Sequence, residues 1–169
     1  MGAMQVTMID ENKYAETTTD VVLPALEQCC EEGWFDPSAA ERSAGIEPLS
    51  GIMDTGGRSG QLHYLCYDSA KFDAIREQGA TATFRGAIVI SHGFTEFAEK
   101  YDELVWYFLL AGYSVCVLEH RGHGKSARDV DNRCMVWIDD WQRYVADLAG
   151  FAETIGQQYA AGMPLNLFC

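Results

Sequence analysis

Two continuous runs of β-branched and apolar residues limit the fold of this chain more than any other feature. Residues 87–91 read AIVIS and residues 113–118 read YSVCVL. Runs without polar alternation are typical of strands buried on both faces of a parallel sheet, and helices must then cover both faces. Between the runs, residues 100–111 carry an apolar stripe at helical spacing and end before Gly112, which supplies a helix stop. The sequence therefore predicts a β-α-β crossover in an α/β fold.

Three further elements are predicted around this crossover. Apolar residues recur at steps of three and four over residues 138–159, which predicts a long helix. Residues 165–169 (LNLFC) begin another buried strand, and residues 61–67 (QLHYLCY) alternate as strands do.

The first part of the chain gives weaker signals. Residues 20–35 predict a short helix, since Pro24 is tolerated only in a first turn and Gly33 suits a helix end. Residues 36–60 are rich in Ser, Gly and Pro, which predicts loops and at most one short edge strand. Residues 71–78 predict a short helical or irregular excursion.

The charge balance excludes some classes of partner. The chain has 12 Lys and Arg against 25 Asp and Glu, a net charge of -13 that repels phosphate backbones and anionic membranes. We therefore expect no nucleic-acid partner. No apolar run reaches transmembrane length and no signal peptide is evident, so we expect a cytoplasmic protein without an integral membrane segment. The six cysteines include no C-x-x-C pair, so no metal site is expected, and Cys116 and Cys169 lie in apolar runs where free cysteine is usually buried.

Three motifs carry a family resemblance. His92 and Gly93 follow the strand predicted at 87–91, with Glu96 and Tyr101 at the spacing H-G-x-x-E-x-x-x-x-Y. Residues 119–126 (EHRGHGKS) are similar to a D-x-R-G-x-G-x-S turn, and residues 144–148 (YVADL) lie in the long predicted helix. Over residues 85–169, the sequence resembles the lysophospholipase and monoacylglycerol-lipase branch of the α/β-hydrolases, which is similar to the serine aminopeptidases S33.

The resemblance implies a fold and a division of the chain. The fold is the N-terminal part of an α/β-hydrolase, with a mostly parallel sheet flanked by helices, truncated before the nucleophile elbow. Residues 1–60 are expected to form an N-terminal helix and loop region. Residues 61–169 are expected to form the first half of the hydrolase core, as an incomplete domain.

The resemblance also implies site residues. An ester hydrolase must stabilise an oxyanion, and in this fold one backbone N–H comes from the loop after the third strand. That loop is here His92, Gly93 and Phe94, with the Phe94 N–H as the donor. The residues expected to support the site are Glu96, Tyr101, Arg121, Gly122, His123 and Gly124. The implied substrate is a small lipid ester, and no cofactor is expected.

The catalytic triad is not found in the sequence. No G-x-S-x-G motif occurs, and the family order of serine, acid and histidine places all four histidines too early. Of His63, His92, His120 and His123, only His92 is expected to line the site. The serine is expected within a few residues after Cys169, where it would complete a Ser-His-Asp triad for carboxylic ester hydrolysis. The chain as given is therefore expected to be inactive and poorly soluble.

Two other interpretations remain. The chain can be a non-catalytic α/β domain for binding or interaction. Gly124-Lys125-Ser126 also mimics a phosphate-binding loop, but Glu119 stands where that motif needs glycine, which makes a nucleotide-binding domain the least favoured reading. Ser126 is interpreted as a turn hydroxyl. Glu119 replaces the Asp usual in the family, so no role is carried over to it.

Overall fold

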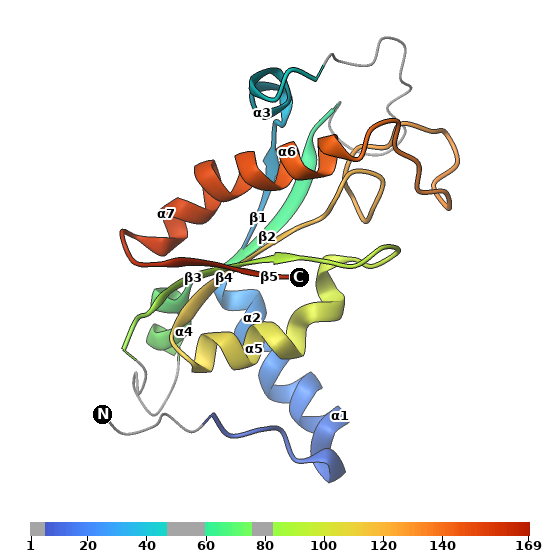
Figure 1. Ribbon diagram of the computed structural model, residues 1–169. Coiled ribbons are helices and arrows are strands. Elements are labelled where there is room, and N and C mark those ends of the chain that lie inside the picture. Colours follow the sequence, from blue (N-terminus) through green and yellow to red (C-terminus); the bar gives the residue numbers. More distant parts are fainter. Residues whose placement is uncertain (1–5, 47–59, 76–82) are drawn as a thin grey trace.

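The protein folds around a five-stranded sheet with helices on both faces (Figure 1). The computed structural model describes residues 6–46, 60–75 and 83–169. The strand order is β1-β2-β4-β3-β5. The strands are β1 (Cys30–Phe35), β2 (Leu62–Tyr67), β3 (Gly86–Ser91), β4 (Tyr113–Leu118) and β5 (Leu165–Phe168). The predicted α/β class and the strands expected at 61–67, 87–91, 113–118 and 165–169 are confirmed.

The sheet is mixed, and its parallel part carries the crossover. β3 pairs in parallel with β4 on one side and with β5 on the other. β2 is antiparallel to both β4 and β1. The carboxyl ends of β3, β4 and β5 therefore meet at one edge of the sheet.

Helices cover the two faces in separate layers. In Figure 1, α6 and α7 lie on one face of the sheet, and α2, α4 and α5 lie on the other. The first layer comprises α3 (Ser38–Ser43), α6 (Gln142–Phe151), η4 (Ala152–Gly156) and α7 (Gln157–Ala160). The second comprises η1 (Glu11–Lys13), α1 (Tyr14–Thr17), η2 (Thr18–Val22), α2 (Leu23–Cys29), α4 (Ser69–Ile75), η3 (Ala98–Tyr101) and α5 (Asp102–Leu110).

Each central strand contributes to two hydrophobic cores. Ile88 and Ile90 of β3 pack in the cluster that includes Val105 of α5. Val89, between them, packs in the opposite cluster with Phe151 of α6. This alternation explains why the runs predicted as doubly buried strands contain almost no polar residue.

The expectation of one helix over residues 20–35 is wrong at both ends. Helical turns begin already at Glu11, and the chain becomes strand β1 at Cys30. Pro24 lies inside the helical run because a π-helical turn precedes it, in which the Leu23 N–H donates to the Thr18 carbonyl. The wider turn accommodates a residue that lacks the N–H of the usual ladder.

Other boundaries also differ from the prediction. Residues 36–60 contain the helix α3, although residues 47–59 lie outside the described ranges. The long helix begins at Gln142 and not at residue 138, because the Asp140 carboxylate accepts the Gln142 N–H at 2.9 Å and starts the first turn. Cys116 is buried as expected, but Cys169 is exposed because it follows the end of β5. Within the described ranges, no helix is long and apolar enough to cross a membrane.

A glycine contact at the start of β3 gives a test of this packing. Gly86 has a φ of 120°, and a Cβ there would lie 2.1 Å from the Pro164 carbonyl oxygen. Gly162 also has a positive φ, 82°, but nothing lies within 4 Å of its Cβ position. We expect Gly86→Ala to lower the free energy of unfolding by about 3 kcal/mol, and Gly162→Ala by about 1 kcal/mol, which reflects backbone strain alone. Equal losses for the two variants in urea unfolding would contradict the close approach.

Candidate active site

Two loops emerge side by side at the carboxyl edge of the parallel strands. Ser91, the last residue of β3, is the register partner of Leu118, the last residue of β4. The loop after β3 and the turn at residues 119–126 therefore start next to each other. This edge of an open α/β sheet is where ligands usually bind.

The loop after β3 is held by its own motif residues. The Gly93 N–H faces both the Glu96 carboxylate and the Tyr101 hydroxyl, each at 3.3 Å. The Tyr101 hydroxyl in turn donates to Glu96. The hydrogen bond from Tyr101 lowers the pKa of Glu96, while burial and that carboxylate raise the pKa of Tyr101. The H-G-x-x-E-x-x-x-x-Y spacing thus closes a turn around one backbone amide.

The N–H of Phe94, the residue after Gly93, is left without an acceptor in the described part of the chain. Thr95 has a φ of 65°, and its N–H donates to Nε2 of His123 at 3.1 Å. Between these two engaged amides, the N–H of Phe94 has no acceptor in the described part of the chain. The Phe94 side chain is 69% exposed. The Phe94 N–H is therefore a backbone donor that the described part of the fold does not use.

His92 and His123 act as neutral hydrogen-bond partners of the backbone. His92 accepts the His120 N–H at Nε2 (2.9 Å) and donates from Nδ1 to the Gly93 carbonyl (2.8 Å). His123 accepts Thr95 and donates from Nδ1 to the Arg121 carbonyl (3.0 Å). Burial lowers the pKa of both rings. Each ring therefore has one fixed tautomer, with the proton on Nδ1.

His120 differs from these two because one of its nitrogens has no partner. Its Nε2 lies 2.9 Å from the Ser91 hydroxyl, and its Nδ1 is buried without a hydrogen bond in the described part of the chain. Burial, together with His92 and His123, lowers the pKa of His120 to about 3. The ring is therefore uncharged at neutral pH.

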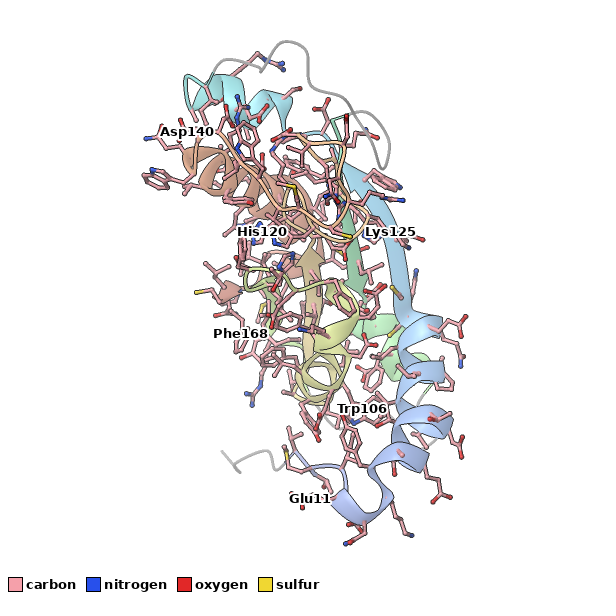
Figure 2. The ribbon with its side chains drawn as sticks, turned by 90° about the vertical axis from the view of Figure 1, so that its right-hand side faces the viewer. Glu11, Trp106, His120, Lys125, Asp140 and Phe168 are labelled. Carbon is pink, nitrogen blue, oxygen red and sulfur yellow. The ribbon has the colours of Figure 1, made fainter. Side chains whose placement is uncertain are left out.

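These groups line one cavity of about 350 Å³. Figure 2 labels His120 and Lys125, which belong to the turn beside the cavity. The lining residues are Ser91, His92, Gly93, Phe94, His120, His123, Tyr144, Val145 and Leu148. The three residues predicted as an oxyanion loop are therefore brought together with His123. The expectation that His92 alone among the histidines lines the site is wrong, because the turn also directs His120 and His123 into this wall.

The remaining predicted site residues lie behind the cavity. Glu96 and Tyr101 hold the loop from outside, and Gly122 and Gly124 adopt positive φ values of 82° and 46° that shape the turn. The Arg121 guanidinium contacts Glu41 at 2.8 Å and Asp147 at 3.2 Å, in a buried cluster of charges. Ser91 and Tyr144 were not expected to line the site, although Ser91 directly precedes the loop motif and Tyr144 is the first residue of the motif at residues 144–148.

Glu119, to which no role was carried over, connects three segments. Its carboxylate accepts hydrogen bonds from His63 Nδ1 (2.8 Å) and from the N–H groups of Lys125 (2.7 Å) and Ala98 (3.1 Å). Burial opposes the charge, but these hydrogen bonds prevail and hold the pKa of Glu119 at about 2. A Cβ at Gly124 would lie about 2.0 Å from this carboxylate, so only glycine fits there.

Ser126 completes the same turn as a structural hydroxyl. It is fully buried, accepts the His63 N–H at 2.8 Å and donates to the Glu119 carbonyl. A hydroxyl that is committed to two backbone groups and shielded from solvent cannot attack a substrate. The interpretation of Ser126 as a turn hydroxyl is therefore confirmed.

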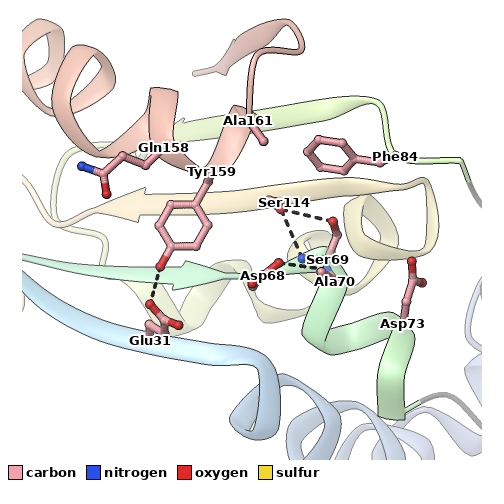
Figure 3. Close-up of a pocket in the computed structure, with 10 residues that line it drawn as sticks. All are labelled: Glu31, Asp68, Ser69, Ala70, Asp73, Phe84, Ser114, Gln158, Tyr159 and Ala161. Atoms are coloured by element: carbon pink, nitrogen blue, oxygen red, sulfur yellow. Dashed lines mark hydrogen bonds between the residues drawn. The ribbon is translucent and has the colours of Figure 1, made fainter.

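A second pocket, of about 530 Å³, lies at the opposite edge of the sheet (Figure 3). It contains Ser114, near the start of β4, and Phe84, which precedes β3. Its polar groups pair with one another, since Tyr159 donates to Glu31 at 2.7 Å and Ser114 donates to a neighbouring serine hydroxyl. None of the predicted site residues lines it. In the described ranges, no group of three or more His, Cys, Asp or Glu is arranged to hold a metal ion.

The parallel strands end here in a loop that its own side chains hold in place, with an unused amide beside a cavity. A highly thermostable carboxyl esterase from Bacillus coagulans, solved with glycerol, has the same fold, with a TM-score of 0.53 and 21% identity. The match covers 83% of this chain and 36% of that one. The family model for serine aminopeptidase, S33, matches residues 82–169, more than half of the chain. The chain therefore belongs to this family, and the resemblance seen in the sequence is confirmed.

Two curated relatives are lipases by name. A monoacylglycerol lipase of Mycolicibacterium smegmatis is 45% identical over 42 residues, which are 25% of this chain and 15% of that protein. A monoglyceride lipase homolog of monkeypox virus is 35% identical over 83 residues, 49% of this chain and 28% of that protein. The alignments thus span less than a third of either relative.

We expect the stability of the fold to depend on pH through the carboxylate of Glu119. The pKa of Glu119 in the folded state is about 2, below the ordinary value of 4.5. The ionised carboxylate therefore adds to the free energy of unfolding above pH 4.5, and this contribution is lost as the pH falls toward 2. We expect Glu119→Gln to lower the free energy of unfolding at pH 7 by on the order of 3 kcal/mol. That difference from wild type should shrink between pH 5 and pH 2. The exposed Glu27→Gln serves as the control, with a change within about 0.5 kcal/mol. A pH-independent difference for Glu119→Gln would refute this role.

Proposed function

We propose that the protein carrying this sequence hydrolyses carboxylic esters of the monoacylglycerol class, with His92, Gly93 and Phe94 as its oxyanion loop. The observation that carries the proposal is the unengaged Phe94 N–H at the wall of the cavity. A backbone donor held in advance at the position where charge develops is what ester hydrolysis needs. Family membership and the two lipase relatives support the choice of reaction.

The register of β5 supports the position of the nucleophile. Phe168, the last residue of β5, pairs with Ile90 of β3, so the chain after β5 emerges beside the loop that begins at His92. In this proposal, the serine follows Cys169, and the acid and base of the triad also come from outside residues 1–169. The Phe94 amide would then face the same space as the serine hydroxyl.

The proposed reaction uses this chain for charge stabilisation and binding. The serine oxygen bonds to the ester carbonyl carbon while the histidine of the triad takes the serine proton. The carbonyl oxygen becomes an oxyanion and accepts the Phe94 N–H. The C–O bond to glycerol then breaks, and the leaving alkoxide takes the proton from the histidine. Water repeats the sequence and releases the fatty acid.

The walls of the cavity favour a neutral, apolar substrate. Phe94, Val145 and Leu148 supply apolar surface, and burial keeps His92 and His120 uncharged. A pocket of this kind binds an acyl chain by removing it from water. The net charge of -13 disfavours anionic lipids and leaves neutral glycerol esters unaffected.

The substrate class is tested by assaying the natural protein on two kinds of substrate. We expect release of fatty acid from a monoacylglycerol emulsion, and at least about 100-fold lower kcat/KM on an aminoacyl arylamide. Titration of released acid and absorbance of the arylamine measure the two reactions. Preferential cleavage of the arylamide would replace the lipase proposal with a peptidase.

The oxyanion donor is tested by removing one N–H. Phe94→Pro deletes the proposed donor, and we expect kcat to fall by about 10²–10³-fold. Phe94→Ala retains the N–H and removes apolar surface from the cavity wall, so it is the matched control: we expect KM to rise and kcat to stay within about fivefold of wild type. An equal loss of kcat in both variants would contradict the assignment of the amide.

A further inference from the structure

We propose that Glu41, on the short helix α3, is a positioning residue for the oxyanion loop. α3 spans Ser38–Ser43, outside the residues 82–169 that match the family model. The kinetic part of this inference rests on the proposed function, whereas its structural part does not. What carries it is a continuous series of contacts that is buried from Glu41 to His123 and ends at Thr95, the residue after Phe94.

The series begins with one carboxylate oxygen between two arginines. Glu41 Oε1 lies 2.8 Å from Nη2 of Arg121 and 2.7 Å from Nη1 of Arg143. The three residues are 6%, 6% and 3% exposed, so the charges are almost completely removed from water. Removing one member of a buried ion cluster leaves the others uncompensated. Glu41 therefore fixes both guanidinium groups at once.

Asp147 shares Arg121 with Glu41, at a longer distance. Asp147 contacts Arg121 at 3.2 Å, but burial raises the pKa of Asp147 to about 6, so its charge weakens just below neutral pH. Nε of Arg121 and Oδ2 of Asp147 are buried without partners in the described ranges. Asp139 accepts from Nε of Arg143, at 2.8 Å, and not from Arg121. The shortest contact that holds the Arg121 side chain is thus the one from α3.

Arg121 passes this constraint to the loop through its backbone. The Arg121 carbonyl accepts His123 Nδ1–H at 3.0 Å and the Tyr144 hydroxyl at 3.2 Å. The opposite nitrogen of His123 accepts the Thr95 N–H at 3.1 Å. Thr95 is held at a φ of 65°, which costs energy in a non-glycine residue and needs such a contact. Thr95 directly follows Phe94, whose amide is the proposed donor.

A second feature determines where α3 lies. A Cβ at Gly150 of α6 would be 2.5 Å from the Cβ of Ala40, which precedes Glu41. α3 therefore approaches α6 closely only because residue 150 is glycine. We expect Gly150→Ala to displace α3, and by less the Phe35 ring, whose Cζ lies 3.1 Å from the same position, without changing any charge. The variant therefore perturbs the contacts of Glu41 by an independent route.

The experiment compares Glu41→Gln, Glu41→Asp and Gly150→Ala in the natural protein. The imidazole ¹⁵N shifts of His123 and the amide shift of Thr95 report the series of contacts directly. We expect both to move in Glu41→Gln and in Gly150→Ala, and to return toward wild type in Glu41→Asp. We also expect kcat to fall by about tenfold or more with KM within about twofold, because misplacing a group near the chemistry affects the rate and not the binding. Glu153→Gln, an exposed carboxylate on η4, is the control and should change neither readout.

The outcomes separate this inference from the proposed function. If Glu41 only stabilised the fold, Glu41→Gln would lower the melting temperature and leave the His123 and Thr95 shifts unchanged, which would overturn the inference. If Glu41→Gln does not fold, the same measurement is made on Gly150→Ala: shifts of His123 and Thr95 that move support the inference, and unchanged shifts overturn it. If the wild-type protein hydrolyses no ester but the His123 and Thr95 shifts still move in the variants, the proposed function is refuted. The structural link from Glu41 to Thr95 then still stands.

Discussion

The buried carboxylate of Glu119 is the interaction on which the site geometry depends. It lies at the end of β4 and takes hydrogen bonds from β2, from the start of η3 and from its own turn. An ionised carboxylate at this depth is stable only because each hydrogen bond compensates part of the lost hydration. The same three contacts place the loop after β3 against the turn at residues 119–126. One charged group therefore positions the two loops that line the cavity, which is also lined by Tyr144, Val145 and Leu148 of α6.

The histidines beside it serve the backbone. His92 and His123 each donate to one carbonyl and accept one amide, so they satisfy groups that the sharp loops leave without partners. Their burial keeps them neutral and makes the cavity wall largely uncharged. The Phe94 N–H, which lies between the engaged amides of Gly93 and Thr95, has no acceptor in the described part of the chain, and it is the group that we propose for the oxyanion.

The sequence predicted those parts in which one physical pattern dominates. The strands at 87–91 and 113–118 were predictable because burial on both faces leaves no polar residue in them. The loop after β3 was expected from its resemblance to the family motif, and in the structure Gly93, Glu96 and Tyr101 of that motif close a local turn. Three features were not: the π-helical turn that admits Pro24, the change from helix to strand at Cys30, and the contacts of Glu41 and Glu119. The last two depend on partners far away in the sequence, which a local pattern does not reveal.

The most direct test of the oxyanion loop is a crystal structure of the natural protein after reaction with a long-chain alkylphosphonate ester. The phosphonyl oxygen stands in for the oxyanion of the tetrahedral intermediate. We expect this oxygen to lie about 2.7–3.1 Å from the Phe94 nitrogen, within the cavity lined by His92 and Leu148. A phosphonate bound with that oxygen turned away from the Phe94 amide, or held at another edge of the sheet, would contradict it.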